Sequence, residues 1–76
     1  MQKQTFTLTA ENTVGVLRRV AGIFSRKGYN IETIHAEPLN EQMTVIRITA
    51  FLTQEQSAEL VKMLRKLYDV ADVEIG

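Results

Sequence analysis

The chain contains no cysteine, no tryptophan, a single proline and a single histidine. Without cysteine there are no disulfide bonds, thiolate metal sites or cysteine nucleophiles, so burial alone must hold the core together. Nine basic residues are balanced by nine acidic residues. The chain therefore lacks the excess positive charge on which a nucleic-acid binder normally relies.

Long apolar runs and sorting signals are missing as well. No apolar stretch approaches the roughly 20 residues that span a bilayer, and residues 1–5 show no basic region followed by an apolar one. We expect a soluble, unprocessed, cytoplasmic protein without a membrane partner. A chain this short buries only roughly 60% of the surface that its unfolded form exposes. We therefore expect one domain over residues 1–76 that a partner surface helps to stabilise.

Hydrophobic periodicity predicts four strands and two helices. Apolar and polar residues alternate over 4–10, 44–52 and 70–75, as in half-buried strands. Between these segments, apolar residues recur at spacings of three and four, which predicts helices that end near residue 27 and near residues 68–69. Residues 29–37 also suit a strand. Because Ile31 and Ile34 fall out of phase there, we expect a bulge or different burial at its two ends.

Local signals place several of the boundaries. Gly28 follows two basic residues, which predicts a left-handed cap at the end of the first helix. Thr53 and Gln56 fit a capping box at the start of the second helix. Residues 38–42 read as the link of a hairpin, since proline cannot donate to a ladder and asparagine tolerates turn geometry.

The predicted order is βαββαβ, an α+β fold. Short connections and crossover handedness close this order as a ferredoxin-like four-stranded antiparallel sheet with both helices on one face. The strand within residues 30–37 then lies at an edge of the sheet, and the strand within residues 44–52 lies near its centre. Pairing of the edge strand with its copy in a second chain would remove an exposed edge. We expect a side-by-side homodimer with a continuous sheet.

The turn after the first strand is the candidate ligand site. Gly15 opens the first helix, where unpaired N–H groups around residues 13–16 suit a carboxylate such as that of a free amino acid. Asn12 and Asn30 add side-chain amides that donate or accept. The apolar neighbours that we expect around an aliphatic side chain are Val14, Leu17 and Ile34. Residue types alone favour structural roles, with Asn12 as a helix N-cap and Gly15 allowing close helix–sheet packing.

A resemblance to a known family favours the ligand-binding interpretation of this turn over the purely structural one. The chain reads Glu11-Asn12-Thr13-Val14-Gly15-Val16-Leu17, then Gly28-Tyr29-Asn30-Ile31-Glu32, and near its end Lys66-Leu67-Tyr68-Asp69-Val70-Ala71-Asp72-Val73. The first two segments resemble the ligand-binding half of an ACT domain. All three resemble the regulatory small subunit of acetolactate synthase (acetohydroxyacid synthase), and the resemblance covers essentially the whole chain.

The resemblance implies a non-catalytic subunit that activates the catalytic large subunit of acetolactate synthase, with feedback inhibition by valine or another branched-chain amino acid left open. It implies that the effector binds between two ACT domains. The resemblance implicates Asn12, Gly15 and Asn30 in effector binding, with Thr13, Val14, Val16 and Leu17 as backbone or packing neighbours. Thiamine diphosphate, magnesium and FAD would belong to the large subunit. This chain has neither a phosphate-binding glycine loop nor a carboxylate metal cluster, so we expect no cofactor or metal here.

Departures from the family leave valine sensitivity open. His35 and Glu37 stand where smaller or apolar residues are expected, and either could narrow, charge or close an amino-acid pocket. The subunit would then activate without sensing valine. The chain also resembles the short single-domain subunits, some of which respond only weakly to valine.

Three alternative functions compare less well. A stand-alone ACT sensor that regulates a different enzyme is the main alternative. RRM domains share the βαββαβ order, but the central strands here carry only Phe6 and Phe51 and no RNP-type sequence. A nucleophile–base set for catalysis is missing, and the lone His35 has no second histidine or cysteine for a metal site.

The densest basic group also has two interpretations. It comprises Arg18, Arg19, Arg26 and Lys27 on the first helix. A solvated helix face with a favourable last turn is the default interpretation. Contact with the large catalytic subunit is the functional one.

Overall fold

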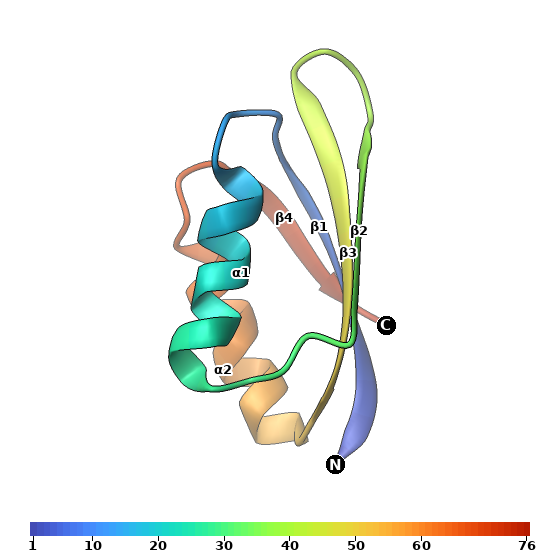
Figure 1. The fold of residues 1–76 in the computed structure, drawn as a ribbon, viewed down its shortest axis with the longest axis vertical. Helices are drawn as coiled ribbons and strands as arrows, with labels where there is room; N and C mark the ends of the chain where they lie inside the picture. Colours follow the sequence, from blue (N-terminus) through green and yellow to red (C-terminus); the bar gives the residue numbers. More distant parts are fainter.

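The computed structural model describes all 76 residues as two layers, a sheet and a pair of helices (Figure 1). The helices pack against one face of the sheet, and the hairpin between the second and third strands extends past their ends. The elements are β1 Gln2–Glu11, α1 Val16–Lys27, β2 Thr33–Pro38, β3 Met43–Leu52, α2 Gln54–Arg65 and β4 Val70–Ile75. The predicted βαββαβ order and ferredoxin-like architecture are confirmed.

The sheet has the strand order β2-β3-β1-β4, with every neighbouring pair antiparallel. β1 and β3 form its centre and pair over ten residues, from Gln2 opposite Leu52 to Glu11 opposite Met43. β2 and β4 form the two edges and have six residues each. The central place of β3 and the edge position of β2 are therefore confirmed.

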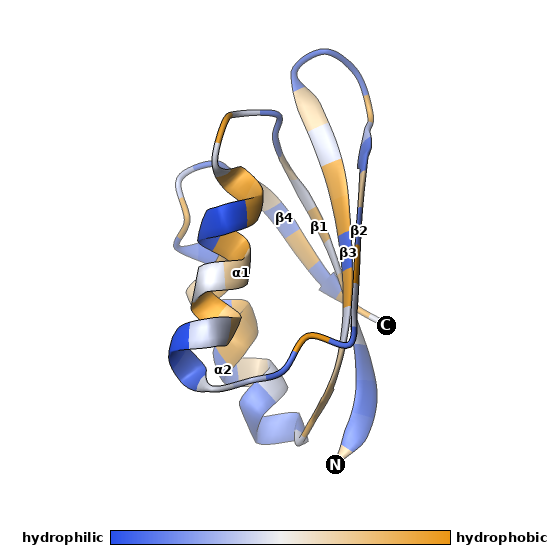
Figure 2. Cartoon of the chain, viewed as in Figure 1, coloured by the Kyte–Doolittle hydropathy of each residue, from blue (hydrophilic) through white to orange (hydrophobic).

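The core lies between the sheet and the helices. Phe6 pairs with Ile48 and Leu8 pairs with Ile46, and all four side chains are fully buried. The ring of Phe6 meets that of Phe24 from α1 edge to face, with centroids 5.9 Å apart, a favoured aromatic geometry. Figure 2 shows hydrophobic segments along α1 and β3 and hydrophilic ones at the β2–β3 hairpin and the start of β1. The other buried hydrophobic residues are Ala10, Val16, Val20, Ile23, Ala50, Leu52, Leu60, Leu64 and Val73.

The predicted caps are present at both helices. Gly28 has φ +74°, and the Tyr29 N–H donates to the Phe24 carbonyl across the end of α1 (2.9 Å). At α2, the Gln56 N–H donates to Thr53 Oγ1 (3.1 Å) and the Thr53 N–H donates to Gln56 Oε1 (2.9 Å). Each helix has 12 residues, and neither is long and apolar enough to cross a membrane.

Two predicted boundaries were wrong. α2 ends at Arg65 rather than near residues 68–69, because residues 66–69 fold back in tight turns that carry Asp69 into the interior. β2 begins at Thr33 rather than at residue 29, and its pairing with β3 is unbroken, without the bulge that we considered. Ile31 and Ile34 do not follow one strand alternation, because Ile31 packs on the core before the strand begins. Ile34 lies within the strand and is 43% exposed.

A buried hydroxyl in α2 yields a stability prediction. Ser57 Oγ is buried without a hydrogen-bond partner, and such a group costs about 1–3 kcal/mol. Ser57→Ala should therefore leave the free energy of unfolding unchanged or raise it by about 1 kcal/mol. Thr53→Ala in the same helix should lower it by about 1 kcal/mol, since the cap is lost. Urea unfolding of both variants checks this, and a marked loss for Ser57→Ala would contradict it.

Candidate functional site

A cavity of about 290 Å³ lies between the β1–α1 turn and the edge strand β2. One wall is formed by the turn and the first turn of α1, and the other by the end of β2 and the start of β3. The lining residues are Asn12, Thr13, Gly15, Val16, Leu17, Ala36, Pro38 and Thr44. The volume lies near the lower end of small-molecule sites, so the cavity suits a molecule as small as a free amino acid.

The backbone at Gly15 shapes the turn. Gly15 is the N-cap of α1 and has φ +89°, a conformation that L side chains rarely adopt. A Cβ at this position would also lie 3.2 Å from Arg19 Nη1, so the missing side chain leaves space for the guanidinium rather than for the sheet. Asn12 is not the cap of α1, and no side chain caps this helix. Instead, the Asn12 N–H donates to the Gln42 carbonyl (2.8 Å) and ties the turn to the β2–β3 hairpin.

Free N–H groups remain at this helix end, although not all of those expected. The Thr13 N–H donates to the Glu11 carbonyl (2.8 Å), and the Val16 N–H makes a long hydrogen bond to the Thr13 carbonyl (3.3 Å). The N–H groups without a backbone acceptor are those of Val14, Gly15, Leu17 and Arg18. Unpaired donors at the positive end of a helix favour an anionic ligand group.

Three of the predicted positions lie outside this cavity. Val14 is completely exposed and Ile34 is 43% exposed, and neither lines it. Asn30 borders a separate hollow beyond the C-terminal end of α1, together with Tyr29 and Phe51. A single chain therefore does not bring Asn12 and Asn30 together.

The sequence interpretation missed three lining residues, Ala36, Pro38 and Thr44. Thr44 is 6% exposed, and its hydroxyl donates to the Glu37 carbonyl (2.9 Å). The inward alternation of β3 extends to this position, so the pattern could have identified it. Ala36 lies opposite Ile46 in the β2–β3 register, a pairing that becomes visible only once the strand bounds are known.

His35 and Glu37 lie on the other face of the sheet. They line a smaller hollow, of about 160 Å³, together with Val45 and Arg47. Because side chains alternate along β2, Ala36 lines the larger cavity while its two neighbours do not. Within one chain, His35 and Glu37 therefore neither narrow nor charge the cavity beside the turn. The smaller hollow borders no free helix N–H groups, so the larger cavity is the better candidate site.

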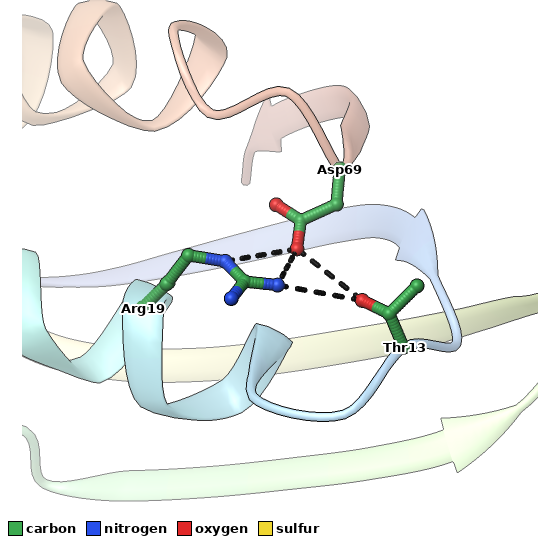
Figure 3. Close-up of polar contacts among 3 residues, drawn as sticks. All are labelled: Thr13, Arg19 and Asp69. Atoms are coloured by element: carbon green, nitrogen blue, oxygen red, sulfur yellow. Dashed lines mark hydrogen bonds and ion pairs between the residues drawn. The ribbon is translucent and has the colours of Figure 1, made fainter.

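A buried carboxylate lies behind the turn (Figure 3). Asp69 is fully buried, and its Oδ2 accepts hydrogen bonds from Arg19 Nε (3.0 Å), Arg19 Nη2 and Thr13 Oγ1 (3.3 Å). The Arg19 guanidinium also lies 5.1 Å from the centroid of the Tyr68 ring. Burial alone would raise the pKa of the Asp69 carboxyl. Hydrogen bonds from Arg19, its own backbone and Thr13, with the charge of Arg19, outweigh that effect and lower this pKa overall.

The basic group on α1 is thus divided between two roles. Arg19 pairs with Asp69, and Lys27 pairs with Glu59 of α2. Each of these two side chains is paired with a carboxylate of another part of the chain, so they do not belong to a uniformly solvated basic face. Arg18 and Arg26 are exposed and form no ion pair.

Comparison with known proteins places the chain in a family. Residues 6–72 match the model of the AHAS small subunit-like ACT domain. The chain belongs to this family. It is 35% identical over 77 residues to the acetolactate synthase isozyme 3 small subunit of Escherichia coli, and covers 47% of that protein with 97% of its own length. It is 39% identical over 71 residues to the acetolactate synthase small subunit of Mycobacterium leprae, with 91% of this chain and 41% of the relative covered.

Solved structures show the same ACT fold. The acetolactate synthase small subunit of Thermotoga maritima superposes with a TM-score of 0.88 at 24% identity, covering 99% of this chain and 47% of that one. The ACT domain from the GTP pyrophosphokinase of Chlorobium tepidum gives 0.82 at 21% identity, covering 97% and 84%. The chain spans less than half the length of the curated relatives that it matches.

The lowered pKa of Asp69 predicts how the stability of this ACT domain depends on pH. The charged carboxylate stabilises the fold fully above its unfolded-state pKa of about 3.9, and this contribution is lost as the pH falls through the lowered folded-state pKa. Asp69→Asn should be less stable than the wild type at pH 7, and the difference should shrink as the pH approaches about 3.

Urea unfolding across this pH range checks the prediction. Glu59→Gln is the matched control, because it removes an exposed ion pair that contributes little. An equal loss of stability for Asp69→Asn at every pH would contradict the ionic role of this carboxylate.

Proposed function

We propose that this chain is the ACT domain of a non-catalytic regulatory small subunit of acetolactate synthase. In this proposal it activates the catalytic large subunit and responds to valine or another branched-chain amino acid. Thiamine diphosphate, magnesium and FAD belong to the large subunit. The observation that carries the proposal is the cavity beside the family's turn, where free helix N–H groups meet apolar walls.

The cavity offers a distinct place for each part of an amino acid. Its carboxylate would accept from the free N–H groups at the start of α1, including those of Gly15 and Leu17. Its aliphatic side chain would pack between Leu17 and Ala36. Its ammonium group requires oxygen acceptors, and the side-chain carbonyl of Asn12 supplies one of them.

The two edges of the sheet favour one mode of dimerisation. All six residues of β2 are exposed, and one side of this strand is unpaired. At the other edge, Arg65 Nη2 donates to the Val73 carbonyl of β4 (3.0 Å) and occupies a backbone group that a new strand would need. We therefore propose that two copies join through β2 into a continuous sheet.

Such a dimer would complete the effector site. In an antiparallel pair of β2 strands with the two-fold axis at their middle, Thr33 of one copy lies opposite Pro38 of the other. Asn30 precedes the start of β2, and Pro38 lines the cavity near its end. Asn30 of the second copy would thus approach the cavity that contains Asn12 of the first, and supply the second amide.

Acetolactate formation by the matching large subunit tests the function directly. The assay compares the large subunit alone and with this chain, each with and without valine. We expect stimulation by this chain and reversal of that stimulation by valine. Stimulation that valine ignores would establish an activator without this effector, and absence of stimulation would favour an ACT sensor for another enzyme.

Substitutions at the turn test the site. Gly15→Asp should abolish valine binding, because it forces a side chain onto φ +89° and puts its Cβ 3.2 Å from Arg19 Nη1, which distorts the turn that presents the N–H groups. Asn30→Ala should weaken binding through loss of the second amide. Gly22→Ala is the control, since nothing lies within 4 Å of a Cβ at that position in α1. Isothermal titration with valine measures binding, and circular dichroism verifies the fold; undiminished binding in both site variants would refute the placement.

A mixing experiment tests whether the site is shared between copies. Asn12→Ala and Asn30→Ala homodimers should each bind valine poorly. In a mixed dimer, one site carries both substitutions and the other carries neither. Unfolding and refolding an equal mixture should restore about one quarter of the sites to wild-type affinity. A mixture that binds no better than its components would place both asparagines in the same copy or outside the site.

A further inference from the structure

The β1–α1 turn is fixed largely by a residue that lies 56 positions further along the chain. The Glu11 N–H donates to the Asp69 carbonyl (2.7 Å) at the start of the turn. The Thr13 hydroxyl donates to Asp69 Oδ2 in its middle, and Arg19 of α1 grips the same oxygen. Asp69 and Arg19 are both absent from the lining of the cavity. Only Thr13 belongs both to the cavity wall and to this cluster (Figure 3).

The hydroxyl of Thr13 lies two residues before Gly15, the N-cap of α1. A threonine or serine hydroxyl close to a helix start can accept from its first N–H groups, which satisfies donors that the helix itself leaves free. Here the hydroxyl donates to Asp69 and accepts from Arg19 Nη2 (3.4 Å), and α1 has no side-chain cap. The first N–H groups of the helix therefore stay open toward the cavity.

Gly15 makes this arrangement possible. Its absent Cβ would lie 3.2 Å from Arg19 Nη1, so any larger residue would push against the guanidinium that binds Asp69. The same glycine supplies the left-handed backbone at the N-cap. The turn, the arginine and the buried carboxylate thus form one interlocked unit.

We propose that Asp69 and Arg19 are positioning residues of the effector site, which hold the Thr13 hydroxyl away from the start of α1 and keep its N–H groups open to the ligand. This inference rests on the proposed amino-acid site. Loss of the Asp69 charge weakens the hydrogen bonds that hold the Thr13 hydroxyl and Arg19, so that the hydroxyl turns to the free N–H groups of α1 and competes with the carboxylate of the ligand. The Asp69 connection therefore controls affinity without touching the effector.

A double-mutant cycle in the full chain, with valine as the probe, tests the proposal. Asp69→Asn should weaken binding about tenfold in the wild-type background. In a Thr13→Val background, which has no hydroxyl to release, Asp69→Asn should cause little further loss. A purely structural role of Asp69 would give the same loss in both backgrounds, and that result would overturn the proposal.

A conservative variant guards against simple unfolding. Arg19→Lys keeps the positive charge but loses the forked donors that grip Asp69 Oδ2, so it should fold and bind valine with an affinity between those of the wild type and Asp69→Asn. Glu59→Gln, at the exposed pair, should bind as the wild type does. Wild-type affinity in Arg19→Lys would count against the positioning role of the guanidinium.

A readout without ligand separates this inference from the proposed function. In ¹H–¹⁵N spectra of the free protein, Asp69→Asn should shift the amide resonances of Val14 to Arg18 and leave those at the start of α2 unchanged. Absence of valine binding by the wild type would remove valine as the effector, and the amide shifts would still test whether Asp69 positions the turn. Unchanged amide resonances in the turn would refute the positioning itself.

Discussion

The antiparallel pairing of β1 with β3 governs the rest of this fold. Over ten paired residues it puts Phe6 opposite Ile48 and Leu8 opposite Ile46, with all four side chains on the buried face. Burial of each such side chain contributes about 1.5–3 kcal/mol, so a slip of one residue would expose most of the core. The opposite face presents half-buried threonines such as Thr7 and Thr9. Both helices must therefore pack on the same side.

The edge strand β2 combines the features that matter for binding. The face of β2 that looks toward the helices is left uncovered next to the start of α1, which creates the cavity. The edge of β2 that points away from β3 has no partner strand and is where we propose that a second copy pairs. A ligand bound where these two features meet would contact both copies and stabilise their association by its preference for the paired state. In the proposed dimer, effector binding and assembly would be linked by this one geometric feature, as allosteric regulation requires.

Local patterns predicted the parts of the fold that local physics determines. The alternation of β1 and β3, the capping box at Thr53 and the left-handed cap at Gly28 all depend on neighbours within a few residues, and all were predicted correctly. The predicted end of α2 was wrong because Asp69 accepts hydrogen bonds from Arg19, 50 residues away in the sequence, and this contact ends the helix early. No periodicity encodes such a contact. The hydrogen bonds that occupy the Thr13 and Val16 N–H groups were likewise invisible, since they depend on the folded shape of the turn.

The Asp69–Arg19 pair differs in kind from the other ion pair of the chain. Lys27 and Glu59 join the helices at the surface, where such a pair contributes little. Asp69 is fully buried, and its interactions with Arg19 favour the charged carboxylate over the neutral one, yet well-packed apolar residues in place of such a buried ion pair are often as stable. Stability alone therefore does not account for an aspartate at this position. The position of Asp69 accounts for it, because the carboxylate fixes the β1–α1 turn. This turn has no side-chain cap, and its open N–H groups line the cavity.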